Sequence, residues 1–113
     1  MRKGTDSNDT LVSGVQTATL TTGLVSTGSF RDVVAYLNVT AVSGTTPTMD
    51  IVLQDSPDNV TWYDIPTGAF TQATAISAQR IVATQLGGYV RAVITIGGAT
   101  PSFTFSLDVA GVI

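Results

Sequence analysis

The chain has 113 residues, of which 43% are hydrophobic and 12% are charged, and its net charge is −3, so we expect one domain with one continuous core. It has no Cys, His or Glu, which excludes a thiolate nucleophile, an imidazole base, a disulfide framework and nitrogen or sulfur ligands for zinc, iron or copper. Five basic residues in an acidic chain cannot form a stripe that binds nucleic acid, and no apolar stretch approaches the roughly 18 residues of a membrane span, so neither partner is expected.

The N-terminus, residues 1–10, reads as a polar arm that precedes a β-sandwich domain at 11–113. Its two basic residues are followed by polar side chains instead of an apolar run, which argues against a secretory signal. An extended arm of this kind can add backbone hydrogen bonds and ion pairs to a partner. The residues that we expect to carry this contact are Arg2, Lys3, Thr5 and Asp6.

Alternation of apolar and polar residues predicts β-strands along the rest of the chain. The expected strands cover 15–22, 31–40, 49–54, 61–65, 79–84, 89–96 and 103–109, with the Thr-rich first one suited to a sheet edge. Thr fills 19 of the 113 positions, and β-branched residues suit a pleated sheet. No helical pattern is convincing. We therefore predict an all-β fold, a single antiparallel β-sandwich or jelly roll of about seven or eight short strands.

Three stretches of turn residues stand out between these strands. The segments 41–48 and 96–102 both place small residues and Thr-Pro after a strand end, and we interpret them as two similar hairpin turns at one end of the sandwich. The tetrapeptide Ser-Pro-Asp-Asn at 56–59 predicts a tight turn with a positive φ at Asn59, which carries Trp62 back over the sheet.

The densest acidic group consists of Asp55, Asp58 and Asp64. Clustered oxygen ligands can hold calcium, but the spacing matches no EF-hand loop and Asx turns explain these residues more simply. Ser and Thr are plentiful, yet no Gly-x-Ser-x-Gly elbow and no His base accompany them. The Gly pairs lack the spacing of a phosphate-binding loop. We predict no metal site, no cofactor, no catalytic residue and no enzymatic activity.

Aromatic residues provide the main candidate for a ligand site. Such side chains can form a platform for a sugar ring, or Trp62 can instead anchor the core while the Tyr hydroxyls reach water. Arg91, in an otherwise apolar strand, can pair with Asp64 or Asp50. The residues of the candidate platform are Trp62, Tyr63, Tyr36 and Tyr89.

Three segments resemble small bacteriophage virion proteins. The stretch 53–65, LQDSPDNVTWYDI, is similar to their "SPDG-TW-DI" hairpin, although Asn59 replaces the usual turn Gly. The stretches 88–94, GYVRAVI, and 100–105, TPSFTF, are similar to their "RYVRA" strand and closing strand, so the resemblance covers about 30–113. It implies a β-sandwich that decorates phage heads or sits at tails. The same segments are also similar to galactose-binding-like and discoidin jelly rolls, which are longer.

The resemblance implies a structural virion component, and our first hypothesis is a capsid decoration, or cement, protein on the outer surface of a phage head. This protein would bind the major capsid protein and stabilise the virion as a homo-oligomer. A surface of Thr, Ser and Gly with few charges costs little to bury, and Val34 and Tyr36 make the second face of their strand less polar than a lone monomer needs. The alternatives are a carbohydrate-binding or host-attachment module with a glycan on the aromatic platform, and a minor tail or neck structural protein.

Overall fold

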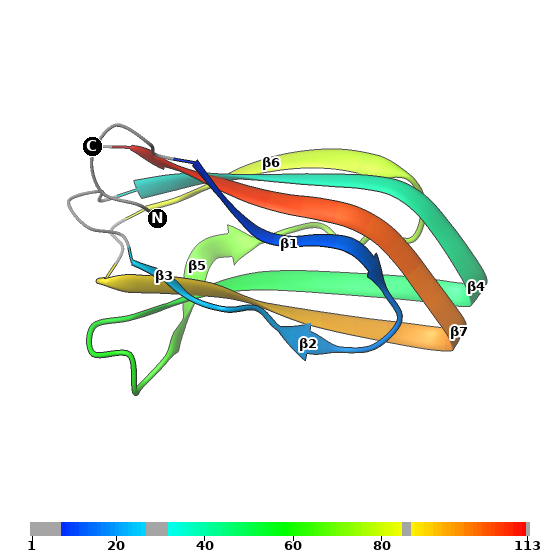
Figure 1. Ribbon diagram of the computed structural model, residues 1–113, viewed down its shortest axis with the longest axis horizontal. Helices are drawn as coiled ribbons and strands as arrows, with labels where there is room; N and C mark the ends of the chain where they lie inside the picture. The colour runs from blue at the N-terminus through cyan, green and yellow to red at the C-terminus, as the bar shows by residue number, and fades with distance from the viewer. Residues whose placement is uncertain (1–7, 27–31, 85–86, 113) are drawn as a thin grey trace.

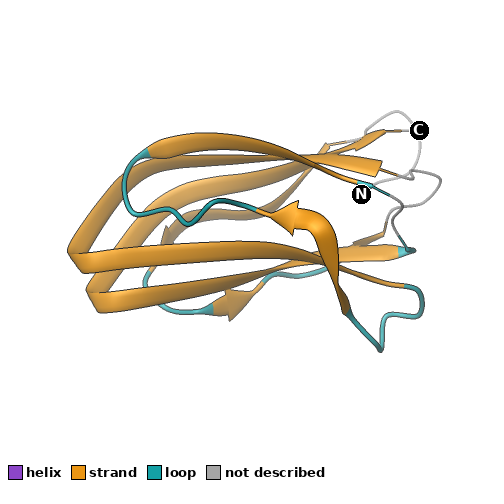
Figure 2. Ribbon diagram, turned by 180° about the vertical axis from the view of Figure 1, so that it is seen from behind, coloured by secondary structure: helices purple, strands orange, loops and turns teal. Residues whose placement is uncertain are grey.

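The computed structural model describes residues 8–26, 32–84 and 87–112, and these residues form strands and loops without a helix (Figure 2). All strand pairings between them are antiparallel. The all-β prediction is therefore confirmed. No helix that could cross a membrane occurs in these ranges. The strands are β1 (Asn8–Gln16), β2 (Leu20–Thr21), β3 (Val25–Ser26), β4 (Asp32–Ser56), β5 (Tyr63–Ala69), β6 (Ser77–Ala83) and β7 (Tyr89–Val112).

Two strands of 25 and 24 residues, β4 and β7, dominate the architecture. They pair with each other from one end to the other, and both fold over midway, so that one continuous ladder forms two layers (Figure 1). The expected strands 31–40 and 49–54 are thus the two halves of β4, and 89–96 and 103–109 are the two halves of β7. The prediction that all strands are short is wrong for these two.

The shorter strands complete each layer. In the first layer the order is β6, β4, β7 and β1, and in the second β5, β4 and β7, with β2 and β3 on the far side of β7. Every second residue of β4 and β7 points between the layers, as the alternation predicted. The core built in this way includes Val33, Ala35, Leu37, Val39, Met49, Ile51, Leu53, Ala92, Ile94, Phe103, Phe105, Leu107 and Val109.

The fold-over is made by a matched pair of corners, one in each long strand. Gly44 has a φ of 112° and Thr46 one of 47°, while Gly98 has 108° and Thr100 has 46°. A Cβ at Gly44 would lie 2.7 Å from the carbonyl oxygen of Thr100, and a Cβ at Gly98 would lie 2.7 Å from that of Thr46. Each corner therefore requires glycine because the other corner lies against it.

The two segments 41–48 and 96–102 are accordingly corners within continuous strands, and their interpretation as hairpin turns is wrong. The local signals of Gly, Thr and Pro are the same for a turn and for a corner. Here the ladder skips residues at Ser43/Thr45 and Thr45/Thr48 and resumes beyond them, because the partner strand bends at the same level. A hairpin would instead end both strands.

The first strand begins at Asn8, within the ten-residue arm that the sequence suggested. Asn8 pairs with Ala110, and the Thr10 hydroxyl donates a hydrogen bond to the carboxylate of Asp108. The expected strand 15–22 spans the end of β1, a break and β2. β1 lies at the edge of its layer. The residues expected to contact a partner, Arg2, Lys3, Thr5 and Asp6, lie outside the described residues.

Candidate functional site

The turn after β4 is held by two short side chains. The buried Ser56 hydroxyl accepts the amide N–H of Asn59 at 2.9 Å, and the Asp58 carboxylate accepts those of Val60 and Thr61 at 2.9 and 3.0 Å. The hydrogen bonds from Thr61 and Val60 hold the pKa of Asp58 below its usual value. Asn59 has a φ of 61°, which confirms the predicted left-handed turn residue. Trp62 therefore directly follows a turn that is held by its own hydrogen bonds.

Trp62 lies on the outer side of the second layer. Its ring is covered by the Arg91 guanidinium, whose central carbon is 4.2 Å from the ring centroid. Arg91 faces outward because its neighbours Val90 and Ala92 are fully buried in the core. The interpretation of Trp62 as a core anchor is therefore wrong.

Gln54 links Arg91 to a carboxylate. The Arg91 Nε–H donates to Gln54 Oε1 at 3.0 Å, and Gln54 Nε2 donates to Asp64 Oδ1 at 2.8 Å. The predicted ion pair of Arg91 with Asp64 or Asp50 is therefore wrong: Gln54 lies between Arg91 and Asp64, and Asp50 accepts hydrogen bonds from Gln72. We call Gln54, Trp62, Asp64 and Arg91 the Trp62 cluster. A cation over an aromatic face and two charge-assisted hydrogen bonds make it a satisfied network.

The three tyrosines of the candidate platform lie in different places. Tyr63 begins β5 and is 58% exposed, but it pairs with Asp55 and so has the opposite orientation to the Trp62 cluster. Tyr89, half-buried, begins β7 opposite Ser56. Tyr36 is 45% exposed on the outer side of the first layer. The structure therefore gathers Trp62, Tyr63 and Tyr89 at one end of the second layer and separates Tyr36 from them.

The outer side of the first layer carries a second candidate surface. Tyr36 of β4 lies between Arg80 of β6 and Asp108 of β7, and Val34, although buried, lies in the next outward row. The sequence suggested Val34 and Tyr36 as an apolar face but missed the flanking residues, because cross-strand register cannot be read from alternation alone. We call the whole set the Tyr36 face: Val34, Tyr36, Arg80, Val82, Asp108 and Ala110.

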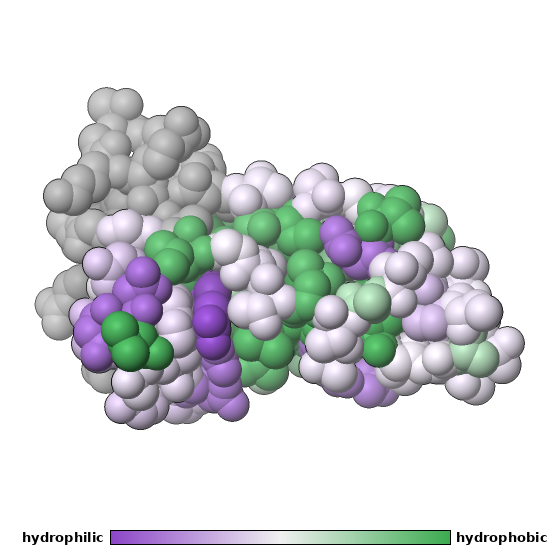
Figure 3. All heavy atoms as spheres, turned by 60° about the horizontal axis from the view of Figure 1, so that its bottom comes forward, coloured by the Kyte–Doolittle hydropathy of each residue, from purple (hydrophilic) through white to green (hydrophobic). Residues whose placement is uncertain are grey.

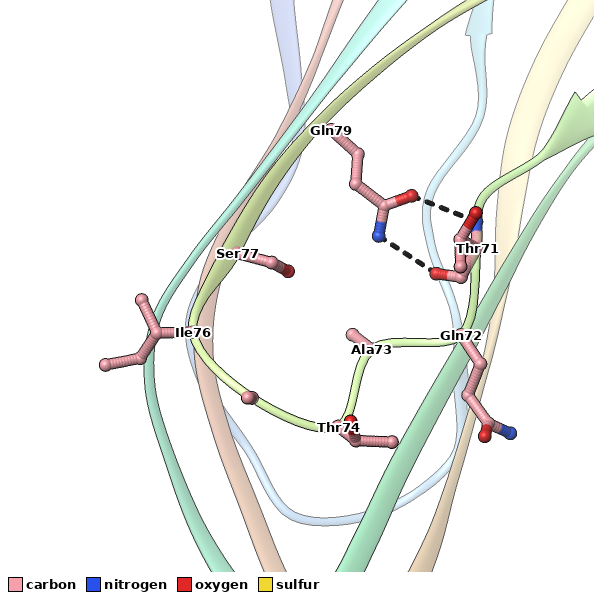
Figure 4. A pocket seen from close by; sticks show the side chains of 8 residues that line it. Thr71, Gln72, Ala73, Thr74, Ile76, Ser77 and Gln79 are labelled. Atoms are coloured by element: carbon pink, nitrogen blue, oxygen red, sulfur yellow. Dashed lines mark hydrogen bonds between the residues drawn. The ribbon is translucent and has the colours of Figure 1, made fainter.

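A shallow hollow of about 340 Å³ lies in the β5–β6 connection (Figure 4). The Gln79 side-chain amide spans it, accepting the Thr71 N–H and donating to the Thr71 carbonyl, both at 2.9 Å. The Ser77 hydroxyl is buried without a hydrogen-bond partner, and Ile76 is 69% exposed and points away from the hollow. The Gln79 bonds close the loop internally, so the hollow is a feature of loop structure.

The acidic residues of the turn region are occupied by hydrogen bonds of the protein itself. Asp55 accepts the Gly87 amide at 2.8 Å, and Asp64 accepts Gln54. Among the described residues no three His, Cys, Asp or Glu side chains form a group that could hold a metal ion. The Asx-turn interpretation is confirmed for Asp58, which accepts two amides of its own turn.

No protein-family model and no curated protein matches the chain. Among solved structures, the exported protein XepA of PBSX has a TM-score of 0.63 at 15% identity, with 94% of this chain covered and 38% of XepA. The SPBc2 prophage-derived protein YomS has a TM-score of 0.50 at 12% identity, with 92% and 91% covered. The CBM22-1 xylan-binding domain of Paenibacillus barcinonensis Xyn10C has a TM-score of 0.47 at 12% identity, with 97% and 100% covered.

The matches to XepA and YomS show a likeness of fold. This chain corresponds to about two fifths of the length of XepA and to nearly all of YomS. The resemblance to phage β-sandwich proteins that the sequence suggested is therefore confirmed at the level of the fold.

Proposed function

We propose that the protein is a non-enzymatic structural component of a bacteriophage particle and decorates the outer surface of the head. The observation that carries the proposal is the fold match to prophage-derived YomS, which extends over nearly the whole of both chains. The fold match to XepA, an exported protein of PBSX, supports the same assignment.

The mechanism is burial of surface across neighbouring capsid subunits. A protein bound over a subunit junction adds contacts that must break before the shell can expand or dissociate, and it stabilises the assembled state by mass action. The surface suits this role, because Arg80 and Arg91 are the only cations among the described residues and uncharged polar groups cost less to desolvate than charges. The partner is the major capsid protein.

The side of the second layer that could lie on such a partner is mixed in character. In Figure 3, hydrophobic and hydrophilic side chains follow one another along the side of the molecule that carries this layer. Its outward apolar residues include Val52 and Val93, which pair across β4 and β7 and are half-buried. A surface of this kind resembles the mixed composition of ordinary protein interfaces.

The N-terminal residues provide a test of head binding. Deleting 1–7 removes Arg2, Lys3, Thr5 and Asp6 but leaves β1 intact, because β1 begins at Asn8. Deleting 1–10 would also remove Thr10 and its bond to Asp108. We expect the full chain to bind purified heads at a fixed copy number, and the 1–7 deletion to bind at least tenfold more weakly with an unchanged melting temperature.

Three outcomes would change the proposal. Full occupancy of heads by the 1–7 deletion would remove the role of the N-terminal residues. Absence of the full chain from heads, measured by quantitative mass spectrometry of purified particles, would contradict the decoration function. Its recovery only in tails or necks would establish the minor tail or neck alternative.

A second function, a carbohydrate-binding or host-attachment module, is favoured by one observation. Trp62 is half-buried on the outer side of the second layer, with Gln54 and Asp64 nearby as hydrogen-bonding groups. The exposed part of the indole can pack against a sugar ring while these groups bind its hydroxyls. A glycan array should then give a signal that Trp62→Ala abolishes and Tyr36→Ala, on the other layer, preserves. No signal from the unmodified protein would dismiss this function.

A further inference from the structure

The outward residues of the first layer are arranged in rows across the strands. One row runs from Arg80 on β6 through Tyr36 on β4 and Asp108 on β7 to Thr10 on β1. With strands about 4.8 Å apart, the backbones at Arg80 and Asp108 stand about 10 Å from each other on either side of Tyr36. Opposite charges therefore flank a central tyrosine at equal spacing.

The neighbouring rows have the same lateral symmetry. On one side Val34, which is only 9% exposed, lies between Val82 and Ala110, so Val82 provides most of the exposed apolar surface of that row. On the other, a row of small polar and apolar residues is formed by Ala78, Asn38 and Ser106. These two rows are thus centred on β4 and carry residues of comparable character on β6 and β7, whereas the central row carries opposite charges at those positions.

Some side chains of the central row lack partners within the described part of the chain. No hydrogen bond or ion pair of Arg80 is found in the part of the chain that the structure describes, and Tyr36 and Val82 are 45% and 39% exposed. Asp108 accepts the Thr10 hydroxyl through one carboxylate oxygen, Oδ1. These features are typical of a protein–protein interface whose partner is absent: an exposed aromatic side chain and an exposed valine lie beside a guanidinium without a partner in the described ranges.

A twofold axis can satisfy all of these groups at once. If the axis lies in the plane of contact, parallel to β4, it moves each residue across the strands but keeps it in its own row. Arg80 of one copy then faces Asp108 of the other, and Tyr36 lies against Tyr36. Val82 faces Ala110, so the apolar row lies on its own equivalent. Such an isologous contact is the commonest symmetry of soluble oligomers.

We propose that the Tyr36 face binds a second copy of this chain, layer against layer about a twofold axis parallel to the strands. Charge complementarity favours a second copy as the partner. After the twofold rotation each Arg80 faces an Asp108, whereas an unrelated protein would match this arrangement of charges only by chance. Three strands and three rows cover a few hundred Å² per copy, which is below the standard size of specific interfaces and typical of weak, transient ones. The pair should therefore form and dissociate over an accessible range of concentration. Such a dimer does not require the phage function.

Charge exchange tests the pairing directly. Arg80→Asp alone places a new carboxylate against Asp108 of the other copy, and Asp108→Arg alone places two guanidiniums together. Sedimentation equilibrium should show that each single exchange raises the dimer dissociation constant at least tenfold. The double exchange, which carries both substitutions in one chain, should restore it to within threefold. An equimolar mixture of the two single variants should form a heterodimer, because both of its charge pairs are then attractive.

The controls separate the interface from the fold. Asp50→Arg makes the same charge change on the outer side of the second layer and should leave the dimer unchanged. Melting temperatures identify any variant that fails to fold. Heterodimer formation in the mixture would show that both single variants are folded and differ only in which charges they present. A monomeric wild type at all concentrations would overturn the proposal. A dimer that neither single exchange weakens, or that the double exchange and the mixture fail to restore, would also overturn it.

Discussion

Two outward arginines, one on each layer, have opposite surroundings. Arg91 on the second layer is covered by the Trp62 ring at 4.2 Å and held by Gln54, which in turn donates to Asp64. Arg80 on the first layer lies beside an exposed Tyr36 and has no acceptor among the described residues. An arginine on this sheet therefore stabilises the fold where neighbouring side chains provide its hydrogen-bond acceptor and cover its guanidinium. It is available to a partner where they do not.

The largest expected effect concerns the corners that place these two surfaces on opposite sides. Gly98→Ala should lower the free energy of unfolding by about 3 kcal/mol, because it adds a close contact with a backbone oxygen to left-handed strain. The added Cβ would lie 2.7 Å from the Thr46 carbonyl oxygen at a φ of 108°. Urea denaturation measures this change, and Gly44→Ala should behave in the same way.

Gly14→Ala is the matched control for the corners. Gly14 has a φ of 112°, as Gly44 does, but a Cβ there has no atom within 4 Å. The strain alone should cost about 1 kcal/mol. Equal losses at Gly14 and Gly98 would show that the packing of one corner against the other contributes nothing.

The second effect compares the arginines themselves. Arg91→Ala removes a cation–aromatic contact and a hydrogen bond to Gln54, and should lower the free energy of unfolding by about 1–2 kcal/mol. Arg80→Ala should change it by less than about 0.5 kcal/mol when measured on the monomer. Both values come from urea denaturation at low protein concentration. Equal losses in the free energy of unfolding would contradict the claim that, among the described residues, Arg91 has stabilising partners and Arg80 has none.

The smallest effect concerns the turn that delivers Trp62 to its cluster. The pKa of Asp58 is lowered by the amides of Thr61 and Val60, so its contribution to stability is present above the unfolded pKa of about 3.9 and is lost as pH falls through the folded pKa. An NMR titration of the Asp58 carboxyl carbon should give a lower midpoint in the folded protein than in an unfolded peptide of residues 56–62. Identical midpoints in the protein and the peptide would contradict the role of these hydrogen bonds.

The sequence predicted those features that depend on neighbouring residues. Alternation identified the core side of β4 and β7, and Ser-Pro-Asp-Asn identified the left-handed Asn59. The corners were misassigned because Gly-Thr-Thr-Pro resembles a turn, and only the matching bend in the partner strand shows that the ladder continues. That bend lies far away in sequence, at Gly98.

The Trp62 cluster and the Tyr36 face could not be predicted from the sequence, because both depend on the register between strands and alternation gives no register. The size and apolar character of Trp62 suggested the core, whereas its position over the outward Arg91 places it at the surface. The Tyr36 face combines residues of three strands, Tyr36, Arg80 and Asp108, and their alignment depends on where β6 and β7 pair with β4. A shift of one residue would turn each of these side chains to the other side of the sheet.

Cryo-electron microscopy of the phage particles that contain this chain tests the proposed function and the proposed dimer most directly. We expect density for the sandwich on the outer surface of the head, as pairs of copies in contact through the layer that carries Tyr36. Heads without such density would contradict the decoration function, and sandwiches on the head whose Tyr36 layer faces solvent would contradict the pairing.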